Sequence, residues 1–358
     1  MASSNPKADS PGDETLAAYK ALGMSFLERS KKPGSIGRLS HYEILKVLGE
    51  GGYGMVLKAF DEKLTREVAI KVLSSEFGAG STPRARFVRE ARAAAAIRHE
   101  NVVAIYAVEE EPNPYLVMEY IPGETLQNLV DRLGRLPVKD VLTIGGQIAR
   151  GLAAAHEKSL IHRDIKPCNI LVEQIGGVYQ AKIADFGLAL ASTDARLTQS
   201  GMVAGTPMYM SPEQARGDKL DPRSDLFSLG CVLYTALTGH PAFGEGNPMV
   251  ILEAIIRSHP KPIRDFAPEA PQWVSGIIGK LLAKKREDRY QSAKDVGKIF
   301  ADVLENPPVD KVRKPQPAAA APTTAGAGVW QKVVLLVLVI VAAAGCAYAA
   351  TLLFFKPS

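Results

Sequence analysis

The sequence predicts an α+β protein in which a strand-rich part precedes a helical part and an apolar segment follows both. Between residues 42 and 71 apolar and polar residues alternate, which is the pattern of half-buried β-strands. From residue 124 onward apolar residues recur at three- and four-residue steps, which is the spacing of amphipathic helices. Residues 333–355 carry no charge and are long enough, as a helix, to cross a bilayer core of roughly 30 Å.

The composition narrows the classes of protein to consider. Of the 358 residues, 46% are hydrophobic and 23% charged, as in a globular protein that carries an additional apolar segment. The formal net charge is +5, and no dense run of lysine and arginine is interleaved with aromatic residues, so nucleic acid is not an expected partner. The three cysteines lie far apart, at neither metal-ligand nor disulfide spacing, which favours a reducing compartment.

Residues 1–41 form an extension ahead of the strand-rich part. Its first dozen residues are polar and contain no secretory signal, and we expect them to be disordered. From Glu14 to Arg29 apolar and charged residues mix at loosely helical spacing. This stretch is either a short amphipathic helix that docks on the folded domain or on a partner, or a frayed extension without a role.

The strand-rich part is expected to hold a sheet of five strands and one helix. Three antiparallel strands fall between residues 42 and 72, and two further strand-like runs cover 102–108 and 115–120. Residues 83–98 are mostly alanine and arginine behind a proline, which predicts a helix. A glycine-rich stretch at 49–54 lies between the first two strands, where a backbone without Cβ atoms can close over phosphates. A dinucleotide-binding fold would need a helix directly after these glycines, whereas residues 56–60 continue as strand.

Residues 161–169 contain the side chains that indicate most directly which reaction the protein could catalyse. Their sequence, Ile-His-Arg-Asp-Ile-Lys-Pro-Cys-Asn, offers a carboxylate, an amine and a carboxamide that can orient a hydroxyl, neutralise a phosphate and hold a metal ion. This stretch resembles the catalytic loop of serine/threonine protein kinases. The motifs Gly-x-Gly-x-x-Gly-x-Val at 49–56, Val-Ala-Ile-Lys at 68–71, Asp-Phe-Gly at 185–187 and Ser-Pro-Glu at 211–213 stand in the order of that family. Residues 42–304 therefore resemble a two-lobed kinase domain with a β-rich N-lobe and an α-helical C-lobe, most like membrane-linked bacterial kinases.

The resemblance implies a catalytic set around ATP and Mg²⁺. Asp164 would accept the proton of the substrate hydroxyl, and Lys166 would neutralise the transferring γ-phosphate. Asp185 and Asn169 would bind Mg²⁺, which suits their oxygen atoms, while no histidine and cysteine cluster is present for zinc.

The amine of Lys71 would contact the α- and β-phosphates while Glu90, on the predicted helix, pairs with it. The alternative for Glu90 is an exposed pair with Arg86, worth about 0.3–0.5 kcal/mol. By the same resemblance Met118 is the gatekeeper beside the adenine, and backbone groups after it bind the adenine edge. The residues expected to contact ATP are Gly49, Glu50, Gly51, Gly52, Tyr53, Gly54, Val56, Ala69, Lys71, Met118, Glu119 and Ile121.

Several residues around the loop are expected to have structural roles. His162 would pack under the loop near Phe186. Cys168 is either a reactive thiol or a small residue required between its neighbours. Asp225 would hold the backbone of the catalytic loop, or act as an acid at a helix N-terminus, or do both. A long-range ion pair between Glu213 and Arg289 is also implied.

Regulation is expected in the activation segment, residues 185–213. Arg163 precedes the catalytic aspartate, and in kinases with this pair its guanidinium usually binds a phosphate on that segment. Thr198 and Ser200 lie where related bacterial kinases are autophosphorylated, whereas Thr206 resembles a hydroxyl that faces the catalytic residues. A homodimer would be one way for the kinase to phosphorylate itself.

The C-terminal part is predicted to anchor the domain to a membrane. Residues 305–329 are rich in proline and alanine, which indicates a flexible linker, and residues 330–356 form the expected transmembrane helix before the tail at 357–358. More basic residues precede this helix than follow it, so the positive-inside rule places the kinase domain in the cytoplasm. Two alternatives to a serine/threonine kinase are a pseudokinase scaffold and a small-molecule kinase. Lys71, Asp164 and Asp185 disfavour the first, and the Gly-Thr-Pro and Ser-Pro-Glu stretches disfavour the second.

Overall fold

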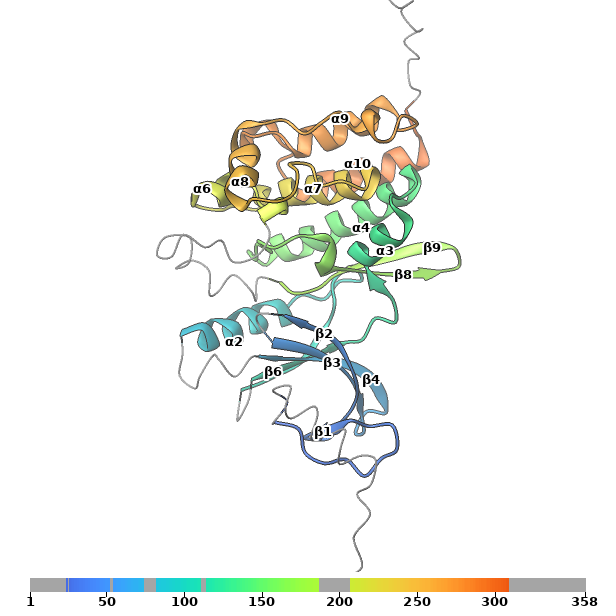
Figure 1. Ribbon diagram of the computed structural model, residues 1–358, viewed down its shortest axis with the longest axis vertical. Helices are drawn as coiled ribbons and strands as arrows, with labels where there is room; N and C mark the ends of the chain where they lie inside the picture. The colour runs from blue at the N-terminus through green and yellow to red at the C-terminus, as the bar shows by residue number, and fades with distance from the viewer. Residues whose placement is uncertain are drawn as a thin grey trace, which may run out of the picture. The chain divides into compact units, whose positions relative to one another are not determined.

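The computed structural model describes residue 24 and residues 26–51, 54–73, 82–110, 114–186 and 207–308. In these residues a lobe built on a β-sheet with one helix is followed by a helical lobe (Figure 1). This order confirms the predicted α+β class and the two lobes of a kinase-like domain. Residues 309–358 form a separate unit that lies outside the described residues.

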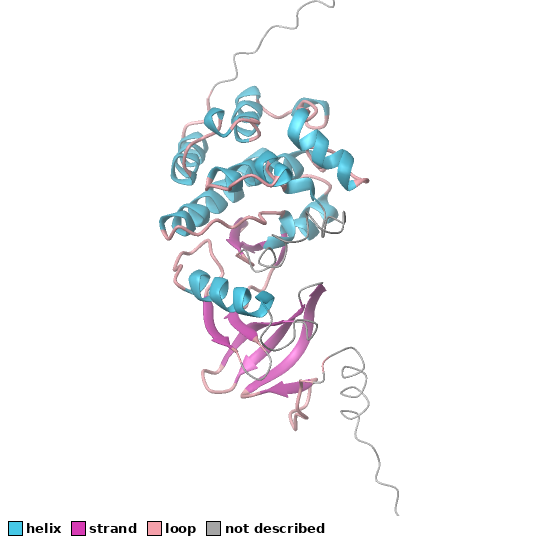
Figure 2. Ribbon diagram, turned by 90° about the vertical axis from the view of Figure 1, so that its left-hand side faces the viewer, coloured by secondary structure: helices cyan, strands magenta, loops and turns pink. Residues whose placement is uncertain are grey.

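The first lobe is a six-stranded antiparallel sheet in the order β1-β2-β3-β4-β6-β5. Its strands are β1 (Gly37–Leu39), β2 (Tyr42–Gly51), β3 (Gly54–Asp61), β4 (Arg66–Leu73), β5 (Ile105–Glu109) and β6 (Tyr115–Glu119). Helix α2 (Thr82–Ala95) covers one face of the sheet through Phe87, Val88 and Ala91 (Figure 2). These three buried residues recur at helical spacing, so the predicted helix is confirmed.

The sixth strand corrects the expected sheet of five strands. Strand β1 comes from the extension ahead of residue 42, and its residues pair with the start of β2. Met24 and Leu27 are 3% and 2% exposed and pack into the sheet's core beside Ile44. The first lobe therefore includes residues ahead of 42, because the extension buries apolar surface that the sheet would otherwise expose. The described residues 26–29 are turn and extended chain, so a helix in the stretch 14–29, one of the two alternatives for it, does not reach them.

The second lobe consists of helices around a small antiparallel sheet. The helices are α3 (Leu126–Leu133), α4 (Val138–Glu157), α6 (Pro212–Arg216), α7 (Arg223–Thr238), α8 (Pro248–Arg257), α9 (Gln272–Leu281) and α10 (Ala293–Glu305). The strands are β7 (Glu124–Thr125), β8 (Ile170–Ile175) and β9 (Val178–Ile183). Short 3-10 turns are η1 (Pro167–Asn169), η3 (Pro207–Tyr209), η4 (Ile263–Asp265) and η5 (Arg286–Asp288). Helices predicted over 138–158, 226–237, 248–258, 271–283 and 291–304 are confirmed within a few residues.

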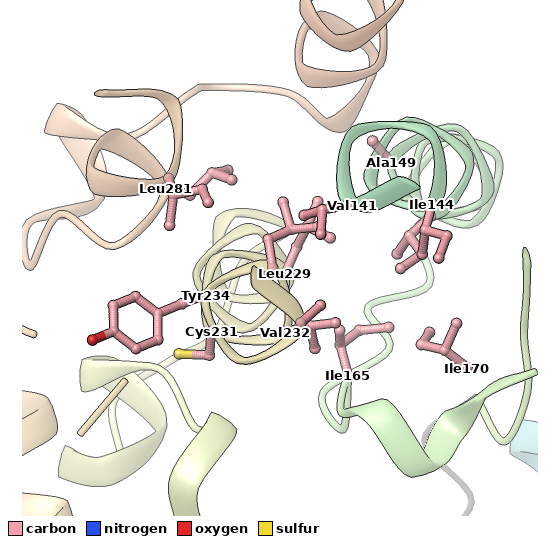
Figure 3. Packing of buried hydrophobic residues seen from close by; sticks show 14 of the residues in the cluster. Val141, Ile144, Ala149, Ile165, Ile170, Leu229, Cys231, Val232, Tyr234 and Leu281 are labelled. Carbon is pink, nitrogen blue, oxygen red and sulfur yellow. The ribbon is translucent and has the colours of Figure 1, made fainter. Parts of the chain in front are cut away.

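Helix α7 is the centre of this lobe. Every residue from Ser224 to Thr238 is buried, which fits a helix whose sequence is mostly apolar and carries only small or hydrogen-bonding polar residues. Figure 3 shows its side chains between those of α4 and α9. Gly230 makes the close approach possible, since a Cβ there would lie 2.8 Å from the Cβ of Leu281. The buried helix gives the functional residues at its N-terminus a rigid support.

None of the helices in the described part of the chain is long and apolar enough to cross a membrane. The span predicted at 330–356 lies outside the described residues.

Candidate active site

The β8–β9 hairpin brings two of the predicted site residues together. Ile170 pairs with Ile183 in the antiparallel register, so the residues just outside this pair, Asn169 and Ala184, are neighbours. The Ala184 N–H donates to the Asn169 carbonyl at 2.9 Å. Asp185 follows Ala184 directly. Asp185, with its carboxylate, and Asn169, with its carboxamide, therefore lie at the same end of this small sheet.

Lys71 connects the two lobes. It lies in the middle of the large sheet, on β4, opposite Val56 on one side and Leu116 on the other. Its Nζ lies 2.8 Å from Oδ1 of Asp185. The structure therefore joins residues that are far apart in the sequence and belong to different lobes.

The electrostatics and backbone of Asp185 are unusual. Burial by itself favours the neutral acid, but the Lys71 ammonium outweighs it and holds the pKa of Asp185 below its ordinary value. The residue has a φ of 58°, a left-handed conformation that is uncommon for non-glycine residues. Glu90, the predicted partner of Lys71, is a half-buried residue of α2, and its pairing with Lys71 stays a prediction.

The catalytic-loop residues form a compact polar group. Asp164 Oδ2 accepts a hydrogen bond from the Asn169 side-chain amide at 3.0 Å and lies 2.8 Å from Lys166 Nζ. The Asn169 amide also donates to the Asp164 carbonyl at 2.8 Å. Burial lowers the pKa of Lys166, but the Asp164 carboxylate more than compensates and raises it above its ordinary value. Lys166 thus stays charged at neutral pH.

The backbone of the loop is held from below by α7. Asp225, at the start of this helix, accepts from the His162 N–H and the Arg163 N–H, each at 2.9 Å. Its Oδ2 also lies 2.8 Å from Nε2 of His156 on α4, a contact that the sequence analysis did not anticipate. The role predicted for Asp225 in holding the loop is confirmed.

His162 has the structural position expected of it. Its side chain is fully buried and its ring lies 4.7 Å from that of Phe186. Nδ1 accepts from the Asp164 N–H at 3.2 Å, so Nε2 is the donor to the Ala184 carbonyl at 3.0 Å. The imidazole thereby ties the catalytic loop to the residues ahead of Asp185.

Glu213 and Arg289 form the predicted ion pair. Their side chains are fully buried and make two parallel contacts of 2.8 and 2.9 Å. Ser224 donates to the same carboxylate at 2.7 Å. Although burial opposes ionisation, hydrogen bonds from Arg289 and Ser224 hold the pKa of Glu213 below its ordinary value.

An apolar cluster lies beside Lys71 and draws on both lobes. Its buried members are Ala69, Val103 and Met118, and its partly buried members are Val56, Tyr120, Ile121, Leu171 and Ala184. The predicted gatekeeper Met118 is 9% exposed and lies opposite Ala69 in the sheet. The glycine-rich stretch forms the hairpin between β2 and β3, as predicted, with Gly51 opposite Gly54. Gly52 and Tyr53, at its tip, lie outside the described residues.

One polar contact that was not predicted lies near the hinge, the residues 119–121 that follow the gatekeeper Met118. Lys182 on β9 lies 2.8 Å from the carboxylate of Glu119, which also accepts from the Ala104 N–H at 3.3 Å. From the sequence, only a backbone role was predicted for Glu119. The alternation of residues along β9 predicts on which face of the strand Lys182 lies. It does not predict that Glu119, in the other lobe, is its partner.

The predicted regulatory hydroxyls of Thr198 and Ser200 lie outside the described residues, as does Thr206, whose hydroxyl was expected to face the catalytic residues. Arg163 is described, and its φ of 67° is again left-handed. Its guanidinium makes no ion pair with another described residue.

Cys168 is exposed on the catalytic loop. Partial desolvation raises the pKa of this thiol more than the nearby Lys166 ammonium lowers it. A raised pKa disfavours the reactive thiolate, so of the two alternatives the small structural residue is favoured.

Comparisons with known proteins agree with this geometry. The family model described as protein kinase domain matches residues 42–300. The chain is 40% identical over 261 residues to serine/threonine-protein kinase PknB of Mycobacterium leprae, covering 71% of this chain and 42% of that protein. It is also 40% identical over 257 residues to serine/threonine-protein kinase PrkC of Bacillus subtilis, covering 71% and 39%. The chain thus spans less than half the length of these relatives.

Solved structures share the fold. The PknI kinase domain of Mycobacterium tuberculosis superimposes with a TM-score of 0.59 at 25% identity, covering 76% of this chain and 99% of that one. A structure of Rad53 residues 1–466 in complex with AMP-PNP gives a TM-score of 0.61 at 26% identity, covering 72% and 64%. The family match covers most of the chain, and the relatives are bacterial serine/threonine kinases. The chain therefore belongs to the protein kinase family, in its bacterial serine/threonine branch.

Proposed function

We propose that this protein transfers the γ-phosphate of ATP to serine or threonine hydroxyls of other proteins. One observation carries the proposal: Lys71 of the sheet lobe lies 2.8 Å from Asp185, next to the polar group formed by Asp164, Lys166 and Asn169. These are the groups that phosphoryl transfer requires, because its transition state needs positioning and charge stabilisation more than covalent chemistry.

The residues fit a magnesium nucleotide. Asp185 offers a carboxylate kept ionised by Lys71, and Asn169 offers a carboxamide whose nitrogen is already used by Asp164. Such oxygen donors suit Mg²⁺, which keeps water and phosphate oxygens in its remaining positions. Asp185 and Asn169 would hold the ion, and its positive charge would offset the negative charge of the phosphates. The cluster of Ala69, Met118 and Leu171 provides apolar surface for an adenine ring, and the Rad53 relative was solved with the ATP analogue AMP-PNP.

The roles of the loop residues follow from their contacts. Asp164 faces Lys166 and is held through its main chain by His162, so its carboxylate is fixed for accepting the substrate proton. Lys166 stays charged and can leave Asp164 for the transferring phosphate, which would lower the negative charge at the reacting centre.

Activation is proposed to follow phosphorylation of Thr198, Ser200 or both. A phosphate on this segment would supply the anion that the Arg163 guanidinium lacks among the described residues. Phosphopeptide mass spectrometry of active protein should find at least one of the two hydroxyls modified. Active protein with both hydroxyls unmodified would contradict this part of the proposal. Autophosphorylation between copies in a homodimer is the simplest route to that state.

We also propose that residues 330–356 anchor the kinase domain to a membrane, with the domain on the cytoplasmic side. The support is the uncharged apolar segment together with the basic residues ahead of it. Truncation before Val329 should move the protein from the membrane fraction to the soluble fraction and leave its activity unchanged. A truncated chain that still sediments with membranes would refute the anchor.

The pseudokinase alternative finds little to favour it. Lys71, Asp164 and Asp185 are all present, Lys71 pairs with Asp185 and Asp164 pairs with Lys166, and the named relatives are called serine/threonine-protein kinases.

The decisive experiment compares the full-length wild type with Asp164→Asn. We expect the wild type to phosphorylate serine or threonine in a general protein substrate, and the variant to lose about 100-fold or more in kcat. Affinity for ATP should stay within about threefold, because Asp164 acts on the hydroxyl and not on the nucleotide. Turnover retained by Asp164→Asn would refute the role of this carboxylate, and nucleotide binding without any turnover by the wild type would favour the pseudokinase.

A further inference from the structure

The helix that follows the activation segment, α6, begins with a capping box. The Ser211 N–H donates to Oε1 of Gln214 at 2.9 Å, and the Gln214 N–H donates to the hydroxyl of Ser211 at 3.3 Å. These reciprocal bonds satisfy two backbone donors at the start of the helix. A glutamate at position 214 would serve this purpose as well as glutamine, because only a side-chain acceptor is needed.

The other end of the Gln214 side chain makes a contact that glutamate could not make. Its Nε2 donates to the Arg163 carbonyl at 2.6 Å, across 51 residues of sequence. The side-chain amide of Gln214 therefore connects α6 to the catalytic loop. Its oxygen accepts from the Ser211 N–H, and its nitrogen donates to the Arg163 carbonyl. A capping role alone does not explain this second bond.

The Arg163 carbonyl belongs to the peptide unit that carries the Asp164 N–H. This N–H donates to Nδ1 of His162 at 3.2 Å, so the peptide is held at its oxygen by Gln214 and at its nitrogen by His162. The preceding peptide is held by Asp225, which accepts from the Arg163 N–H at 2.9 Å. Arg163 itself has a φ of 67°, a conformation that persists only when its surroundings hold it in place.

We propose that Gln214 is a positioning residue for catalysis: it fixes the Arg163–Asp164 peptide and so couples α6 to the orientation of the Asp164 carboxylate. The inference rests on the proposed function, since it gives Gln214 a purpose in phosphoryl transfer through Asp164. It also connects α6, which begins where the activation segment ends, directly to the catalytic loop.

Two variants of the full-length protein separate bridging from capping. Gln214→Glu keeps the acceptor for Ser211 and loses the donor to Arg163, whereas Gln214→Met loses both. We expect both variants to lower kcat about 10-fold, because the Asp164 carboxylate would be misplaced. The KM values for ATP and for the protein substrate should stay within about twofold of the wild type, because Asp164 acts only in the chemical step. Arg216→Gln, an exposed change on the same helix, is the matched control and should match the wild type.

The kinetic outcomes decide between the roles. Wild-type kcat in Gln214→Glu together with a loss in Gln214→Met would assign capping alone to this residue and overturn the proposal. A raised KM for the protein substrate with unchanged kcat would also overturn it, because it would make Gln214 a substrate contact.

A second measurement does not depend on activity. Hydrogen exchange of residues 161–169 in the full-length protein should be about 10-fold faster in Gln214→Glu than in the wild type, while exchange in α4 and α7 stays unchanged. If exchange in the loop did not change, the bridge would not hold this peptide, and the proposal would fail. The proposed function can fail separately from the bridge. If the wild type were inactive but hydrogen exchange of residues 161–169 were still faster in Gln214→Glu, the proposed function would be refuted and the bridge would stand.

Discussion

Two ion pairs join distant parts of this molecule, and they differ in how far water reaches them. The side chains of Glu213 and Arg289 are 0% exposed, whereas those of Lys71 and Asp185 are 12% and 28% exposed. The first pair is surrounded by protein and has further hydrogen bonds from Ser224 and to main-chain carbonyls. The second connects the lobes at the place where the proposed nucleotide binds. The difference indicates that the first pair stabilises the fold and the second serves the reaction.

The largest expected effect is on the buried pair. Glu213→Gln leaves the Arg289 guanidinium in the interior without its counter-charge, so the free energy of unfolding should fall by about 3–5 kcal/mol. Chemical denaturation of the full-length protein measures this loss. The exposed pair of Arg135 and Glu269 is the matched control, and Glu269→Gln should cost less than about 1 kcal/mol. Equal losses in the two variants would remove the distinction between buried and exposed pairs in this lobe.

The second prediction concerns the pair between the lobes. Lys71→Met should lower kcat/KM at least about 100-fold, equivalent to about 2.7 kcal/mol of transition-state stabilisation. The free energy of unfolding should change by less than about 1 kcal/mol, because the Asp185 side chain remains accessible to water. Steady-state kinetics and denaturation on the same preparation check both parts. A variant that unfolds as readily as Glu213→Gln would place Lys71 among the stabilising residues.

An intermediate case sharpens the comparison. Lys182 and Glu119 are 25% and 26% exposed, and their pair also joins the two lobes. Lys182→Met should lower the unfolding free energy by about 0.2–1 kcal/mol, the range of solvent-accessible pairs. Because Glu119 lies at the hinge, the KM for ATP should rise by about twofold while kcat stays unchanged. A loss as large as that predicted for Glu213→Gln would show that burial is not what separates these pairs.

The last expected effect is on the pH dependence of stability, at a cation without a carboxylate partner among the described residues. Lys284 lies 3.9 Å from the centre of the Phe243 ring and donates to the Ile255 carbonyl at 2.7 Å. Burial lowers the pKa of this amine from 10.5 to about 8.

The unfolded chain therefore binds more protons than the folded one between these two pH values, so stability should rise with pH across that window. Denaturation at a series of pH values measures the slope. Lys284→Met should show a smaller slope than the wild type. An identical slope in both proteins would mean that the amine titrates normally in the folded state.

Much of this architecture could be predicted from the sequence, for identifiable reasons. The mostly apolar sequence between Leu226 and Leu237 predicts helix α7, and the motifs identify Asp164 and Asp185 by their positions in the chain. The extension was harder to interpret. Leu27 is flanked by phenylalanine and charged residues without a clear period, and Gly37–Leu39 is too short to be recognised as a strand before it pairs with β2.

Long-range polar contacts were predictable only where the family resemblance named them. The Glu213–Arg289 pair was foreseen in this way, and the bond of Asp225 to the loop backbone likewise. The contacts of Lys182 with Glu119 and of Gln214 with Arg163 were not, because they depend on how separate elements pack and not on local spacing.

The most direct test of the central claim is a crystal structure of the protein with Mg²⁺ and a non-hydrolysable ATP analogue. If one phosphoryl-transfer site exists, Lys71 will contact the α- and β-phosphates, Asp185 and Asn169 will bind the metal, and Asp164 will face the γ-phosphate from the substrate side. A nucleotide bound elsewhere, or at this position without contacts to these four residues, would contradict the account.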